Sequence, residues 1–278
     1  MSSYRFCRTD DIGLLVDALN RCWAPHYPGE PAMTPAAFKR SIRDLQVWCS
    51  SCMVAFSGAD PIGVLIGAKR SSGTLIHRIA VHPDHMRQGH GRHLLTSISS
   101  KLAILGPPRL VAEVPGSFTA ARQLFEACGY DQESVLTDYI LDTHEPASAH
   151  GGWFVIPVTL EDLDANGLLE HEQPRCWERS IETLTARKDE ITGVAVASDE
   201  QIEAYVLDAD GEVLSLRSLV DDGGGRLRHL LSLTGTRAAG TLRISKVHPA
   251  EISSELLGSI GFRPAGTHDT YVGKARSA

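Results

Sequence analysis

The chain has 278 residues, 42% of them hydrophobic and 22% charged, with a formal net charge of −7. These values are typical of a globular protein, and the length suits two domains of roughly 140 residues each. An acidic chain without a basic stripe is a poor nucleic-acid binder, because contacts to phosphates supply most of that affinity, so we expect no nucleic-acid partner.

Membrane and redox functions are also disfavoured. No apolar run approaches the roughly 20 residues of a membrane-spanning helix, and the residues after Met1 lack a signal-peptide pattern. We therefore expect a cytoplasmic protein without a membrane partner. Cys49 and Cys52 have the spacing of a redox pair, but they run directly into a strand-like segment instead of starting a helix. We expect ordinary core cysteines and no metal site.

The first half reads as alternating strands and helices, separated by turns rich in Gly and Pro. Its predicted strands are 4–8, 52–57, 62–69, 74–81, 109–114 and 134–141. Its predicted helices are 10–23, 35–45, 91–105 and 119–128. The next segment, 142–152, is small and polar without an apolar period, which is typical of a linker.

After this linker the order of elements begins again. The predicted strands are 153–158, 191–198, 201–207, 212–220, 242–247 and 267–274. The predicted helices are 160–169, 177–187, 226–234 and 250–260. The halves also end alike, with Phe125–Tyr130 (FEACGY) matching Leu257–Phe262 (LGSIGF). An internal repeat of about 140 residues explains this pattern, so we predict domains at 1–145 and 146–278.

The segment Ile79–Leu95 has the strongest chemical signal. A β-branched strand ends at Val81, a turn follows at Pro83, and a loop with Gly89 and Gly91 opens a helix. A helix N-terminus presents unpaired N–H groups and a partial positive charge, which suit an anion. Glycines let the backbone approach a phosphate closely, and Arg87 and Arg92 add positive charge. This combination predicts an anion site.

With this motif in place, the first half resembles the GCN5-related N-acetyltransferase (GNAT) superfamily. The family pattern is a strand ending in Val, a His-Pro-like turn, and Arg/Gln-x-x-Gly-x-Gly/Ala at a helix start. The resemblance implies two tandem GNAT-like domains of mixed α/β class, each a mostly antiparallel central sheet flanked by helices. It also implies acetyl-CoA as co-substrate, with no metal. The implied cofactor-binding residues are Ile79, Ala80, Val81, Arg87, Gln88, Gly89, His90, Gly91 and Arg92.

This sequence departs from the family pattern at three positions. The first Arg/Gln of the motif is Met86, the usual tyrosine acid corresponds to Phe125, and a usual asparagine corresponds to Phe118. For the base that deprotonates the amine, the candidates are His77, on the strand leading to the loop, and Glu113, near the end of the next strand. Each has an alternative role as a structural residue of the sheet.

The corresponding loop of the second half is shorter and acidic, with Asp221 and Asp222 before its glycines. These carboxylates would repel a pyrophosphate, so we expect a degenerate copy. The resemblance implies an N-acetyltransferase acting on an amine of a small molecule or protein. The alternative is a non-catalytic protein that binds acetyl-CoA, which Phe118 and Phe125 favour. The sequence leaves the oligomeric state open.

Overall fold

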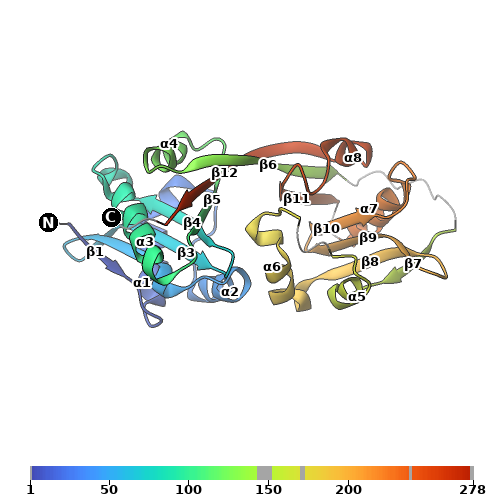
Figure 1. Cartoon of the computed structure of the whole chain (residues 1–278), viewed down its shortest axis with the longest axis horizontal. Helices are drawn as coiled ribbons and strands as arrows, with labels where there is room; N and C mark the ends of the chain where they lie inside the picture. Colours follow the sequence, from blue (N-terminus) through green and yellow to red (C-terminus); the bar gives the residue numbers. More distant parts are fainter. Residues whose placement is uncertain (1, 143–151, 170–172, 238–239, 276–278) are drawn as a thin grey trace. The chain divides into compact units, whose positions relative to one another are not determined.

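The structure is a computed structural model that describes residues 2–142, 152–169, 173–237 and 240–275 (Figure 1). The chain forms two compact units. Unit 1 comprises residues 1–134 together with 269–278, and unit 2 comprises residues 135–268. The units therefore do not follow the predicted division at residue 145. The last residues of the first half belong to unit 2, and the last residues of the second half belong to unit 1. The assignment of two GNAT-like sequence copies to 1–145 and 146–278 stays a prediction.

Unit 1 contains a sheet in the order β1-β2-β3-β4-β5-β12. Neighbouring strands from β1 to β4 run antiparallel, whereas β4 and β5 run parallel. The strands are β1 (Ser2–Phe6), β2 (Met53–Ser57), β3 (Asp60–Lys69), β4 (Thr74–Val81), β5 (Arg109–Pro115) and the last part of β12 (Arg263–Lys274). The helices are α1 (Ile12–Cys22), α2 (Pro35–Leu45), α3 (His90–Leu105) and α4 (Thr119–Ala127).

The core of unit 1 lies between α3 and the sheet. Leu94, Leu95, Ile98 and Leu102 recur at helical spacing along α3 and pack against strand residues such as Leu65. Figure 1 shows α3 lying across β3 and β4. This packing fixes the N-terminus of α3 beside the end of β4, because the connection between them is short.

Unit 2 repeats this plan, with a sheet in the order β6-β11-β10-β9-β8-β7. Its one parallel pair among the described strands, β10–β11, occupies the place of β4–β5. The strands are β6 (Asp131–Asp142, beginning in unit 1), β7 (Phe154–Pro157), β8 (Thr192–Ala197), β9 (Ile202–Ala209), β10 (Glu212–Ser218) and β11 (Thr241–Val247). The helices are α5 (Leu160–Ala165), α6 (Ile181–Ala186), α7 (Gly225–Arg237) and α8 (Ser254–Ser259). The predicted mixed α/β class and internal repeat are confirmed.

Some sequence predictions need correction. The single helix predicted over 177–187 is wrong: a 3₁₀ turn at Trp177–Arg179 is followed by α6. The cause is Ser180, whose hydroxyl accepts the Thr183 N–H and starts a new helix as its N-cap. The predicted linker at 142–152 falls almost entirely outside the described residues.

The cysteines behave as core residues. Cys49 and Cys52 are buried and form no disulfide, and burial raises the pKa of the Cys52 thiol. Within the described residues, no helix is long and apolar enough to cross a membrane.

Candidate functional site

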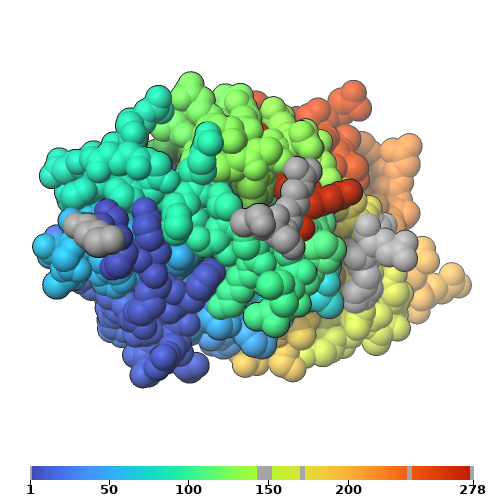
Figure 2. All heavy atoms as spheres, turned by 60° about the vertical axis from the view of Figure 1, so that its left-hand side comes forward, coloured from blue at the N-terminus to red at the C-terminus, as the bar shows by residue number. Residues whose placement is uncertain are grey.

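A cavity of about 440 Å³ opens in unit 1 where β4 ends and α3 begins. Four segments surround it: the end of β4, the loop before α3, the start of α4, and the connection after α1. Its lining residues include Trp23, His26, Tyr27, Ile79, Ala80, Val81, His85, Met86, Arg87, Gly89, His90, Gly91, Arg92, Phe118, Ala121 and Leu124. The teal atoms of residues from about 80 to 105 lie at the molecular surface in Figure 2.

The loop before α3 has the geometry of an anion cradle. Arg87 has φ +62° and Gly89 has φ +87°, and Gly89 is the N-cap of α3. The first helical N–H with an intrahelical partner is that of His93, which donates to the Gly89 carbonyl at 3.0 Å. The preceding N–H groups of α3 therefore point out of the helix end. The first turn contains no acidic residue to occupy them.

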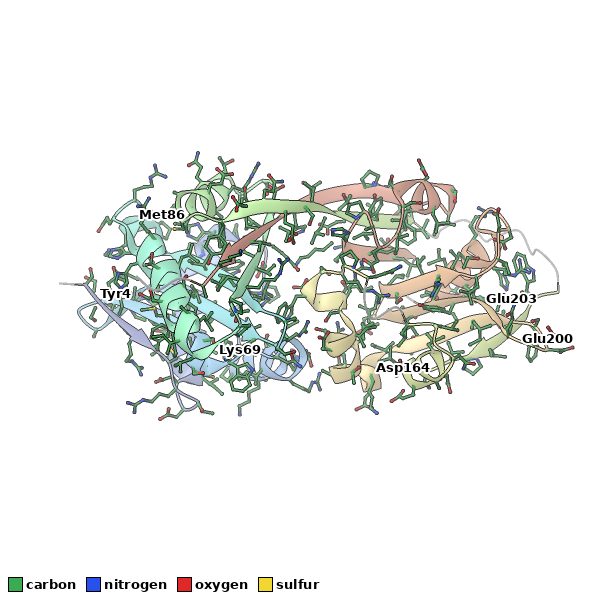
Figure 3. The ribbon with its side chains drawn as sticks, in the orientation of Figure 1. Tyr4, Lys69, Met86, Asp164, Glu200 and Glu203 are labelled. Carbon is green, nitrogen blue, oxygen red and sulfur yellow. The ribbon has the colours of Figure 1, made fainter. Side chains whose placement is uncertain are left out.

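The two glycines of this loop serve different purposes. Gly89 needs the left-handed conformation, and a Cβ there would meet nothing within 4 Å. At Gly91, a Cβ would lie 3.0 Å from Leu124 Cδ2. Gly91 therefore permits close packing of α3 against α4, and the exposed backbone of the cradle depends mainly on Gly89. Met86, which lies in this loop ahead of Gly89, is labelled in Figure 3.

The charged side chains lining the cavity are cationic or titratable. Arg87 and Arg92 contribute positive charge, and the imidazoles of His26, His85 and His90 lie around them. Among the described lining residues there is no carboxylate. The cavity therefore favours an anion at the α3 end.

His90 is held in place by Tyr4 of β1, whose hydroxyl lies 2.6 Å from His90 Nδ1. Burial lowers the pKa of His90, and the nearby imidazoles of His85 and His93 lower it further. Both effects favour the neutral form of His90 at the start of α3.

The opposite side of the cavity is aromatic. The Trp23 and Tyr27 rings stack with centroids 4.2 Å apart, and Tyr27 stacks on Phe118 at 4.6 Å. The Arg78 guanidinium lies 4.8 Å from the Trp23 ring centroid, and Trp23 Nε1 donates to Glu30 at 3.0 Å. These partners fix the Trp23 ring, so the wall is a preformed apolar surface.

His26 lies between the aromatic wall and the end of β4. Its Nε2 is 2.9 Å from the Val81 carbonyl oxygen. A carbonyl can only accept, so Nε2 carries the hydrogen, and in the neutral ring Nδ1 has the free lone pair. This tautomer makes Nδ1 a proton acceptor at the cavity. Sequence analysis missed His26, because a lone histidine in an irregular loop gives no periodic signal.

The structure places the predicted site residues unequally. The cofactor-binding candidates line the cavity, except for Gln88, which is exposed and donates to the Asp84 carbonyl. The catalytic candidates His77 and Glu113 are half-buried and are not among the described lining residues. His77 is the extra residue of a β-bulge, since Ile66 pairs with Arg78 and Gly67 with Ile76.

Phe125, which stands at the position of the tyrosine acid in the family pattern, is buried in the core. It stacks with Tyr271 and meets Tyr130 edge-on. Burial raises the pKa of the Tyr130 hydroxyl well above its usual range, which disfavours the phenolate. In the described residues, no group of three or more His, Cys, Asp or Glu side chains is arranged to hold a metal ion.

In unit 2 the corresponding cradle is filled by the chain itself. The Asp222 carboxylate accepts the N–H groups of Gly224 at 3.0 Å, Gly225 at 3.1 Å and Arg226 at 2.8 Å. The Arg226 guanidinium also donates to Asp222 and to Glu203. Burial disfavours ionisation of Asp222, but these hydrogen bonds outweigh it and hold its pKa below the usual range. The internal carboxylate takes the position of an external anion.

Comparisons with known proteins agree with this geometry. A family model described as "Acetyltransferase (GNAT) domain" matches residues 48–132. The chain is 38% identical to [Ribosomal protein bS18]-alanine N-acetyltransferase of Escherichia coli over 64 residues. This match covers 23% of the chain and 43% of the enzyme, so the chain spans less than half the length of that curated relative.

Solved structures match over nearly the whole chain. A tandem GNAT protein from the clavulanic acid biosynthesis pathway, without AcCoA, has a TM-score of 0.67 at 16% identity and covers 100% of both chains. A GCN5-related N-acetyltransferase from Sphaerobacter thermophilus has a TM-score of 0.70 at 13% identity, covering 99% of this chain and 96% of its own. Residues 48–132 thus match the GNAT domain model, and the full length of the chain has a fold similar to that of these GNAT structures.

Proposed function

We propose that the chain is an acetyl-CoA-dependent N-acetyltransferase whose active site is the unit 1 cavity. The observation that carries this proposal is the cradle at the α3 N-terminus, where outward N–H groups and two arginines adjoin an apolar cavity. The family match over residues 48–132 supports acetyl transfer in general.

In this proposal the N–H groups from Arg87 to Arg92 hold the pyrophosphate of the cofactor, assisted by the Arg87 and Arg92 side chains. Ile79, Ala80 and Val81 form the edge along which the pantetheine arm lies. Acetyl-CoA supplies the acetyl group as a thioester. The apolar wall excludes water from the reacting end of the cavity.

His26 is the residue best positioned to take a proton from the acceptor amine. Its Nε2–H is held by the Val81 carbonyl, so the basic Nδ1 is oriented by the β4 backbone. His77 and Glu113 remain candidates from sequence, but neither is among the described residues that line the cavity, so a proton would have to reach them through other groups. His26 lines the cavity and could accept the proton directly.

The acceptor is expected to approach along the Trp23–Tyr27–Phe118 wall. The charged side chains that line the cavity are arginines and histidines, and the nearby Glu30 carboxylate accepts a hydrogen bond from Trp23. The wall therefore offers ring faces, and no carboxylate, to the acceptor. We therefore propose an amine attached to an apolar or aromatic group, on a small molecule or at a protein terminus. The similar E. coli enzyme is named for a protein alanine.

A second candidate, a non-catalytic protein that binds acetyl-CoA, is favoured by Phe125 and Phe118 in place of the usual polar residues. Release of free coenzyme A separates the two functions. The chain is mixed with acetyl-CoA and a panel of aromatic, aliphatic and peptide amines. If it is an enzyme, the rate of thiol release rises with the concentration of one or more of these amines. Binding of acetyl-CoA with no amine-dependent release across this panel would favour the second candidate.

A further inference from the structure

Unit 2 has a pocket of about 150 Å³ that the proposed function does not use. Its described lining residues lie at the end of β10, before and at the start of α8, on β9 (Tyr205), and between α5 and α6 (Leu168, Gln173 and Arg175). The equivalent segments of unit 1 are the end of β4, the start of α4 and the connection after α1, which form the larger cavity. The pocket is thus the remnant of the same cavity in the second copy.

The polar groups of this pocket are unusual for a remnant. The Arg175 side chain lines it and is only 7% exposed. Within the described residues, Arg175 Nε and Nη1 have no hydrogen-bond partner. Buried guanidinium nitrogens without acceptors cost free energy, because the hydrogen bonds that they lose to water are not replaced. An acceptor that enters the pocket would complete this arrangement.

The nearby carboxylate does not satisfy Arg175. Glu251 Oε1 lies 3.6 Å from Arg175 Nε, beyond hydrogen-bond distance, whereas its Oε2 accepts directly from the fully buried Arg179. Glu251 is thus shared between Arg179, which donates to it directly, and Arg175, which it meets only as an ion pair, so these three side chains together carry one excess positive charge. Arg217 also lines the pocket and donates to the Leu168 carbonyl at 3.3 Å.

Besides Glu251, neutral hydroxyl groups also line the pocket. Ser215 is 3% exposed, and its hydroxyl lies 3.4 Å from the Tyr205 hydroxyl, which donates to the Leu168 carbonyl. A volume of 150 Å³ corresponds to about five water molecules at the liquid density. The space fits an anion of a few non-hydrogen atoms and excludes one the size of a nucleotide.

We infer that unit 2 binds a small oxyanion in this pocket, with the Arg175 guanidinium as its main ligand. The ligand carries a carboxylate or a phosphate group, both of which accept two parallel hydrogen bonds from arginine. This site is separate from the cradle that Asp222 fills, and it does not depend on catalysis in unit 1.

Calorimetry at constant ionic strength tests this with sodium acetate and sodium phosphate as separate probes. The full chain is compared with Arg175→Met and with the matched control Arg243→Met, an exposed arginine of the same unit. Phosphate can also occupy the α3 N-terminus of unit 1, so the difference between the variants is the decisive quantity. We expect Arg175→Met to lose one site per chain, or at least tenfold in affinity, and Arg243→Met to lose nothing.

The probe that shows this difference identifies the ligand as a carboxylate or a phosphate. Equal binding of both probes by the wild type and Arg175→Met would overturn the inference, as would no binding of either probe to the wild type. Thermal unfolding provides a check on folding: without anions, Arg175→Met should melt no lower than Arg243→Met, because it removes buried nitrogens that lack acceptors and leaves Glu251 paired with Arg179. A large drop in its melting temperature would show that Arg175 is satisfied within the chain, and would also overturn the inference.

Discussion

The Asp222 carboxylate accepts the backbone N–H of Arg226 at 2.8 Å, at the place in unit 2 that corresponds to the open N-terminus of α3 in unit 1. The two units thus share a strand–loop–helix connection, but the helix N-terminus is open in unit 1 and filled by a side chain in unit 2. In unit 1 the N–H groups face outward beside Arg87 and Arg92, whereas in unit 2 a side chain of the loop accepts them. This difference supports a division of labour in which unit 1 binds the cofactor.

The glycine at the α3 N-cap gives the first prediction. Gly89→Glu should abolish acetyl-CoA binding, because it places a negative side chain in the cradle at a backbone φ of +87°. Gly223→Glu is the matched control, since Gly223 also has positive φ and open space for a Cβ. Calorimetric titration of both variants should show binding by Gly223→Glu only; equal losses would contradict the assignment of the two loops.

His26 gives the second prediction. Gln can keep a donor toward the Val81 carbonyl but has no basic nitrogen, so His26→Gln should lower kcat by about 10²–10⁴-fold. The Kd for acetyl-CoA should change little. His77→Gln is the comparison for the residue predicted from sequence, and we expect a smaller effect on kcat. A larger loss of kcat in His77→Gln than in His26→Gln would assign the base to β4 instead.

The aromatic wall gives the third prediction. Trp23→Ala removes one ring of the stack and the donor to Glu30, so KM for the best amine should rise about tenfold, which corresponds to about 1.4 kcal/mol of lost contact. The Kd for acetyl-CoA should stay the same. Trp48→Ala, at a tryptophan that is 54% exposed and does not line the cavity, is the control and should leave both quantities unchanged.

The low pKa of Asp222 gives the fourth prediction, on stability. Because its folded pKa lies below the unfolded value of about 3.9, the ionised carboxylate stabilises unit 2 above that pH. This stabilisation is lost as the pH falls through the folded pKa. Asp222→Asn should therefore reduce the free energy of unfolding by about 1–3 kcal/mol at pH 7.

As the pH falls below about 3.9 and through the folded pKa, the difference between wild type and Asp222→Asn should shrink, because protonation removes the charge from the wild-type side chain. Urea unfolding curves at pH 7 and at a series of lower pH values measure this. A constant difference across the range would show that the charge of Asp222 does not stabilise the loop.

The sequence predicted most of the elements and the cofactor loop, because both have strong local signals. The strand Thr74–Val81 and the helix Pro35–Leu45 have the predicted bounds, because the strand is rich in β-branched residues and Pro35 stands at a helix start. The loop before α3 was recognised because glycines, arginines and a helix start coincide within a few residues.

The features that the sequence did not predict depend on contacts that local patterns do not encode. His26 meets Val81 across 55 positions, and nothing in its own neighbourhood distinguishes it from a surface histidine. The acidic loop of unit 2 was expected to repel a phosphate, but its sequence could not show that Asp222 turns back onto three N–H groups. The buried Arg175 lies in an irregular segment, where no periodicity predicts burial.

The number of acetyl-CoA molecules bound per chain tests the central claim most directly. Isothermal titration of the full chain with acetyl-CoA should show one site, because one cradle is open and the other is filled by Asp222. Binding at two equivalent sites, or no binding at all, would contradict the assignment of the cofactor site to the α3 N-terminus of unit 1.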